Sequence, residues 1–202
     1  MKYEPGYIFG MALQSIPEPR RVARDLFDQG LPRNTLWAML ALILVLGAML
    51  GVVSGLLFPV APELEGTIIA NPMMVAVAEA SIAVLTAFFV FWVSRAAGGT
   101  GSFEDGLITV IWVNFVLLMV QTLVLVLTFI APGLAVLLWI FGSFAGIWIM
   151  SHFIAEAHGF TSAGRVFLGV VMTGLVAAVV LSVVLTLLGV MAGVQVEDLS
   201  NV

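Results

Sequence analysis

The sequence predicts an all-α polytopic membrane protein, in which a short interfacial helix precedes a bundle of five transmembrane helices. Hydrophobic residues make up 62% of the 202 residues and charged residues only 9%, whereas about a quarter of a soluble domain is charged. The chain also contains five apolar segments of spanning length, and its basic residues gather in alternate loops. Together these observations indicate that lipid is the main solvent of the fold.

Residues 1–33 are the polar part of the chain, and we expect them to be cytoplasmic. Within them, residues 16–29 read as an amphipathic helix, because Pro17 and Pro19 suit a first helical turn and Gly30 suits a helix end. The segment lacks the apolar run of a signal peptide, so we expect the first apolar segment to act as the insertion signal. One helix face is apolar and carries Val22, Ala23, Leu26 and Phe27.

Basic residues surround this apolar face. Arg20, Arg21 and Arg24 are the candidate membrane-surface contacts, because cationic side chains beside an apolar stripe are typical of helices on anionic headgroups. The alternative is a plain solvated helix that leads into the first membrane segment.

The membrane domain is predicted to cover residues 34–190, followed by an extracytoplasmic tail, residues 191–202. A spanning helix needs roughly 20 residues, and no alternating pattern of a β-barrel is present. The break Ala131–Gly133 is so short that it predicts a tight helical hairpin, and Asn71 with Pro72 predicts a capped helix start. The five expected helices are 34–58, 73–94, 107–130, 134–156 and 165–190.

The positions of the basic residues predict the orientation. Five precede the first membrane helix, Arg95 lies between the second and third, and Arg165 lies between the fourth and fifth. An inside N-terminus and an outside C-terminus would place all seven on the cytoplasmic side, as the positive-inside rule requires. For a bacterial source, this predicts a multi-pass protein of the cell inner membrane.

The two cytoplasmic loops resemble each other. Gly99–Ser102 leads into the third membrane helix and Gly159–Ser162 into the fifth, and Ser102 with Asp105 fits a capping box. The similarity indicates either a duplicated helical hairpin or, as we favour, the same turn chemistry used twice. The glycines at 98–101 lack the strand and lysine of a phosphate-binding loop, so we interpret them as a turn.

These features together resemble the bacterial branch of the Yip1 family. The matching features are the proline-led helix Pro17–Phe27, five close-set membrane helices, the loop Gly98–Phe103 and the stretch His158–Ser162, over about residues 13–190. Eukaryotic members, which are linked to Rab GTPases, carry an Asp-Leu-Tyr-Gly-Pro motif that this sequence lacks. The resemblance implies a non-enzymatic protein that organises membrane or binds another membrane protein, and it carries over no catalytic residues.

Glu79 is the most informative single residue, because it lies about 10 Å along its helix from Pro72, at a depth where a carboxylate is costly. Gln121, Ser143 and Ser182 lie at a similar depth on other helices, and we expect Glu79 to pair with one of them. We favour a polar clasp between helices. The alternative is a proton or cation site of a small transporter or channel subunit.

A second polar layer is expected nearer the cytoplasm, formed by Asn114, His152 and Thr173. His152 and Glu156 share a helix face, and with His158 they could suggest a metal site. The zincin motif and cysteine are absent, so we favour an ordinary His/Glu pair and expect no metal or cofactor.

Small residues predict close helix packing. The candidate stripes are Gly47, Gly51 and Gly55 on the first membrane helix and Gly142 with Gly146 on the fourth. We favour packing within one bundle over a homodimer contact. Among the tryptophans, Trp112 is expected in the interfacial belt and Trp148 within the bundle.

The sequence therefore favours a non-enzymatic membrane organiser or scaffold, with membrane lipid and another membrane protein or complex as partners and no nucleic acid. A transporter centred on Glu79 is the alternative. An intramembrane enzyme is disfavoured, because no nucleophile and base form a recognisable set. The oligomeric state is left open.

Overall fold

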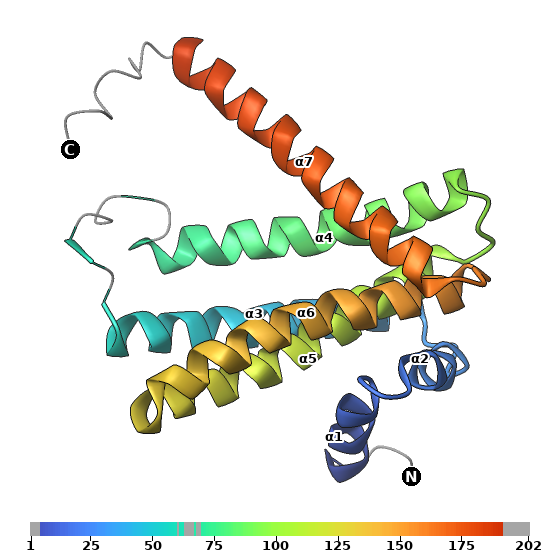
Figure 1. The fold of residues 1–202 in the computed structure, drawn as a ribbon, viewed down its shortest axis with the longest axis horizontal. Helices are drawn as coiled ribbons and strands as arrows, with labels where there is room; N and C mark the ends of the chain where they lie inside the picture. Colours follow the sequence, from blue (N-terminus) through green and yellow to red (C-terminus); the bar gives the residue numbers. More distant parts are fainter. Residues whose placement is uncertain (1–4, 60, 63–66, 68–69, 192–202) are drawn as a thin grey trace.

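The computed structural model describes residues 5–59, 61–62, 67 and 70–191, and over these residues all regular secondary structure is helical (Figure 1). Five long helices follow two short ones. In chain order they are α1 (Pro5–Gln14), α2 (Pro19–Phe27), α3 (Arg33–Leu57), α4 (Pro72–Ala96), α5 (Phe103–Ile130), α6 (Pro132–Ala157) and α7 (Ala163–Met191).

The five long helices, α3 to α7, confirm the predicted fold class. Each contains a stretch that is long and apolar enough to cross a membrane, with mean hydropathy between 2.0 and 2.6. Most of their surface is unburied within the chain, as expected for helices whose outer faces contact lipid. The predicted tail lies outside the described residues from position 192 onward.

Local sequence signals explain where these helices begin and end. The side chain of Asn71 accepts hydrogen bonds from the backbone N–H groups of Met73 and Met74, which caps α4. Ser102 and Asp105 form the predicted capping box of α5. Ala131 alone separates α5 from α6, so these two helices form the predicted tight hairpin.

The α5–α6 hairpin is the centre of the fold. α3 packs against α4 and α5, α4 packs against α5, and α7 packs against α6. The C-terminal half of α7 (orange to red) diverges from α4 (Figure 1). One core cluster joins Leu36 and Leu40 of α3, Ala87 of α4 and Leu107 and Ile111 of α5.

The N-terminal segment differs from its prediction, because it contains two helices and both dock on the protein. α1 was not predicted. The apolar face of α2 is buried, with Val22 only 1% exposed, and it packs with α1 against α5 and α6. The predicted apolar face of this helix is present, but it packs against protein and not against lipid. The cluster contains Met11, Ala12, Val22, Ala23, Trp112, Val113, Val116, Ile149 and Phe153.

Docking of α1 also changes the roles of two tryptophans. Trp112 is buried, and its indole N–H donates to the Ser15 hydroxyl at 2.8 Å. Trp148, expected inside the bundle, is 47% exposed and donates to the carbonyl of Ile16 at 3.3 Å. The indole N–H groups thus join the end of α1 to α5 and α6.

Candidate functional site

α4 and α6 end in the same way, at the end of the bundle where α2 docks. Each is followed by a glycine in the left-handed region, Gly98 with φ 89° and Gly159 with φ 72°. The next N–H group bonds back five residues: Gly99 donates to Ser94, and Phe160 donates to Ala155, both at 2.8 Å. This is the Schellman helix ending, and it gives a physical reason for the similarity of the two loops.

The two loops meet at His158. The backbone N–H of Gly101 donates to Nδ1 of His158 at 3.2 Å, and the N–H of Thr100 donates to its carbonyl at 3.3 Å. A Cβ added at Gly99 or Gly101 would lie 2.8 Å or 2.7 Å from atoms of the His158 side chain. Glycine is therefore required here by close approach to the imidazole.

The same hydrogen bonds test whether residues 98–101 could form a phosphate-binding loop. The N–H groups of residues 98 to 101 donate to Arg95, Ser94, His158 carbonyl and His158 Nδ1 in turn. None of the four is available to cradle a phosphate, which supports the interpretation as a turn.

His158 is held as a neutral imidazole. Because Nδ1 accepts a hydrogen bond, the ring proton is on Nε2, and Nε2 is buried with no partner among the described residues. Burial lowers the pKa of His158, and the charge of Arg95 lowers it further, while Asp105 raises it. The side chain acts as a fixed acceptor between α6 and the α4–α5 loop.

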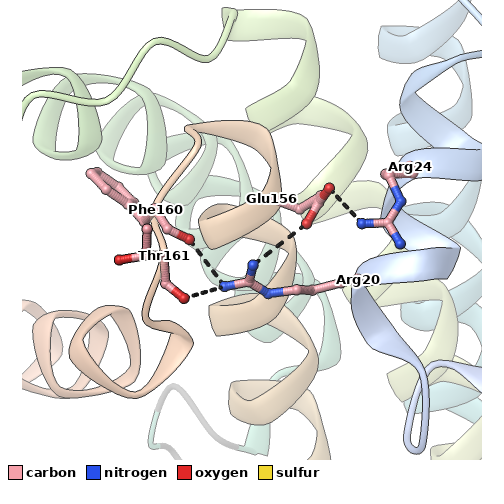
Figure 2. A network of polar contacts seen from close by, with 5 residues as sticks. All are labelled: Arg20, Arg24, Glu156, Phe160 and Thr161. Carbon is pink, nitrogen blue, oxygen red and sulfur yellow. Dashed lines mark hydrogen bonds and ion pairs between the residues drawn. The ribbon is translucent and has the colours of Figure 1, made fainter.

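Figure 2 shows a second polar cluster, where α2 meets the end of α6. Arg24 Nη1 donates to Glu156 Oε1 at 2.8 Å, and Arg20 Nη1 lies 3.8 Å from Glu156 Oε2. Arg20 Nη2 also donates to the carbonyls of Phe160 and Thr161, at 3.0 Å and 3.2 Å. Glu156 therefore pairs with α2 and not with His152.

All three arginines proposed to contact headgroups have a carboxylate partner within the chain. Arg21 pairs with Glu18 at 2.9 Å, next to the two that share Glu156. Their side chains remain partly exposed, so further contact with lipid stays a prediction.

An intramembrane cavity of about 430 Å³ lies among α3, α4, α5 and α6. Glu79, Gln121 and Ser143 line it together, as does Asn114. Ser143 donates to the Trp139 carbonyl at 2.9 Å, and Asn114 donates to Val110 at 2.8 Å. Glu79 makes no hydrogen bond within the described part of the chain, so the clasp stays a prediction. Ser182 lies on α7 and is not among the residues that line the cavity.

Asn114, His152 and Thr173 have different surroundings, and their common depth stays a prediction. Asn114 lines the cavity and Thr173 lines a separate groove between α4 and α7. The ring of His152 stacks on Trp148 at 4.2 Å, and its Nδ1 lies 2.9 Å from the Trp148 carbonyl. In the described ranges, no three His, Asp or Glu side chains are placed to hold a metal ion.

The two glycine stripes have different surroundings. Gly142 and Gly146 face Val120 and Leu117 of α5, and an added Cβ would lie 2.5 Å and 3.2 Å from them. This stripe lets α5 and α6 approach closely. An added Cβ at Gly47, Gly51 or Gly55 would meet nothing within 4 Å, so the first stripe makes no close contact inside the described chain. α3 uses its Leu36 and Leu40 face instead.

Sequence reasoning missed α1 and the loop contacts of His158. A signal for α1 was present: Ile8, Met11, Ala12 and Ser15 recur at helical spacing, although Gly6 and Gly10 weaken it.

A protein-family model described as the Yip1 domain matches residues 13–195. No curated protein and no solved structure matches the chain significantly.

Proposed function

The chain belongs to the Yip1 domain family, and from this premise we propose that it binds and organises another membrane protein or complex without catalysing a reaction. It is a multi-pass integral membrane protein with five apolar spans. In a bacterial source, its location would be the inner membrane.

The observation that carries this proposal is the docking of α1 and α2 on the bundle. A helix held by a buried apolar face and by Glu156 presents its outer face in a fixed position. That outer face carries charges of both signs, with Arg21, Asp25 and Asp28 exposed. A pre-organised polar surface lowers the cost of ordering on binding, and mixed charge favours one partner orientation over others.

The test is co-purification in mild detergent with charge reversal on this face. The wild-type chain should elute in a discrete complex, and the double variant Arg21→Glu/Asp25→Arg should lose the partner. Arg95→Glu is the matched control, because Arg95 is an exposed arginine in the last turn of α4, away from α2. A wild-type protein that elutes alone, or a partner retained by the double variant, would contradict the proposal.

A small transporter or channel subunit is the second candidate, and the cavity that contains Glu79 favours it. An acidic side chain in a membrane cavity with Gln121 and Asn114 has the composition of a proton or cation site. Substitution Glu79→Gln separates the candidates. A structural role predicts little change in stability and none in ion flux, whereas a coupling role predicts loss of flux in reconstituted vesicles.

A further inference from the structure

A long groove separates α4 from α7, floored by α6. Its volume is about 940 Å³, and it is lined by α4 from Ile82 to its C-cap Ala97, by Met150 and Ile154 of α6, and by one face of α7. α7 diverges from α4 toward its C-terminal end (Figure 1). The groove between these two membrane helices is not enclosed, and lipid surrounds helices of this kind.

The length of the groove corresponds to one leaflet. Residues 82 to 97 span about 22 Å of helix at 1.5 Å per residue. Half of a bilayer, headgroup region included, is about 20–22 Å thick. The groove thus runs from the loop end of the bundle to about the bilayer midplane.

The walls suit hydrocarbon chains. The α4 wall contributes large apolar side chains, including Leu85 and Phe89, and the α7 wall is smooth because it carries Gly169, Gly174 and Ala177. Small residues on a membrane helix usually allow another helix to approach closely. Here α4 stays apart, and an added Cβ at Gly169 or Gly174 would meet no atom within 4 Å.

The mouth of the groove is polar and cationic. Thr161, Ser162 and Arg165 line it at the loop end. The Arg165 side chain is exposed, and it has no hydrogen bond or ion pair in the described part of the chain, unlike Arg20, Arg21, Arg24 and Arg33. A guanidinium group with hydroxyl groups beside it matches a phosphate ester.

We propose that the groove holds one phospholipid of the leaflet on the Arg165 side, with its acyl chains between α4 and α7 and its phosphate on Arg165. The charge of the phosphate complements Arg165, the only cationic side chain among the described residues that line the groove. The lipid fills the space between α4 and α7 and so acts as a structural element of the bundle.

A helix from a partner or from a second copy fits the groove less well. A partner helix would need to place an acidic side chain opposite Arg165, whereas a phospholipid carries its negative phosphate in the headgroup.

The test measures phospholipid bound to the purified full-length protein. Native mass spectrometry should detect one phospholipid per wild-type chain after exchange into detergent. In mixed micelles, phosphatidylglycerol should bind at least about tenfold more tightly than diacylglycerol, because hydrogen bonds to charged groups are the stronger ones. Inorganic phosphate should not displace the lipid.

Two variants and two matched controls locate the site. Arg165→Ala should weaken phosphatidylglycerol binding about tenfold or more, and Gly174→Phe, which fills the groove, should abolish retention. Arg95→Ala and Gly51→Phe should behave as wild type, because neither residue lines the groove and Gly51 has open space around it. Equal affinity for diacylglycerol, displacement by inorganic phosphate, or a second copy cross-linked at position 174 without lipid would overturn the proposal.

Discussion

The imidazole of His158 makes glycine necessary at two positions of another loop. Gly99 and Gly101 belong to the α4–α5 connection, and His158 follows α6, yet the ring occupies the space where Cβ atoms would lie. A single ring thus fixes how two helical hairpins meet.

The substitution Gly101→Ala should destabilise the protein. Its Cβ would lie 2.6 Å from the Ala157 carbonyl and 2.7 Å from His158 Nδ1, and backbone at that distance cannot move away cheaply. We expect a loss of about 1–3 kcal/mol, measured as a lower melting temperature in detergent. Gly51→Ala is the control, where open space and helix propensity predict no loss or a gain of up to about 1 kcal/mol.

The lowered pKa of His158 predicts that stability falls in mild acid. The folded pKa lies below the ordinary value of 6.5, so between the two values the unfolded chain binds more protons. The contribution of the neutral His158 to the free energy of unfolding is complete above about pH 6.5. It is lost as the pH falls toward the folded pKa, by up to about 1.4 kcal/mol per pH unit. Melting temperatures measured from pH 7.5 to 5 report it.

His158→Gln should flatten this pH dependence even if it lowers stability at every pH. His152→Gln should leave the slope unchanged, because His152 contacts Trp148 and takes no part in the loop junction. Equal slopes in wild type and His158→Gln would refute the assignment.

Short-range polar features could be predicted from sequence, and long-range ones could not. The caps at Asn71 and Ser102 follow from residues two or three positions apart. The Gly101–His158 bond joins residues 57 positions apart, and no local pattern reports such a pairing. The spacing along the helix predicted that Glu156 pairs with His152. In the structure its ion-pair partners are Arg20 and Arg24 of the distant helix α2.

Among the elements, α2 is held mainly by its apolar face. Val22 and Ala23 are 1% and 0% exposed, whereas the guanidinium of Arg24 is largely exposed, and such ion pairs contribute only about 0–1 kcal/mol. The ion pairs therefore orient the helix more than they hold it.

Two substitutions should separate these contributions. Val22→Asp places an unpaired carboxylate in the apolar contact and should release α2, whereas Glu156→Gln should weaken docking only slightly. Amide hydrogen exchange of residues 19–27 is the measurement. Asp28→Asn, at an exposed position, is the control. Strong protection of α2 in Val22→Asp would contradict this view.

The elements were predicted unevenly. The membrane helices can be recognised in the sequence by their length and hydropathy. α1 was not predicted because it is short and depends on tertiary contacts. Among these are the hydrogen bonds of Trp112 and Trp148 to Ser15 and Ile16, directly after its end. The α2 pattern specified an apolar face, but amphipathicity does not distinguish lipid from protein as its partner.

At the scale of the molecule, the number of membrane-spanning helices could be predicted from the sequence. Which of these helices pack against each other could not. Lipid chains are as apolar as leucine, so hydrophobicity carries little information about which faces meet. Counting along each helix placed Ser182 at the depth of Glu79, but such counting could not show that α7 packs on α6 or that Ser182 lies outside the lining of the Glu79 cavity. The family could be recognised because its layout extends over most of the chain.

The orientation can be tested in cells, because the chain has no cysteine. Cysteines introduced singly at Asp28 and Ala61 should react differently with a membrane-impermeant thiol reagent. The positive-inside distribution predicts that Ala61→Cys is labelled from outside and Asp28→Cys only after permeabilisation. The reverse pattern would show the opposite insertion.

The long-range contacts of the N-terminal helices impose a delay during biosynthesis. Arg24 emerges from the ribosome 132 residues before Glu156, which at 5–20 residues per second is a wait of roughly 7–26 s. During that time the apolar face of α2 lacks the α6 part of its docking site, Ile149 and Phe153, while Tyr7 and Phe9 remain exposed even in the finished fold. Until α6 has been made, the bilayer surface offers this amphipathic segment an alternative apolar contact.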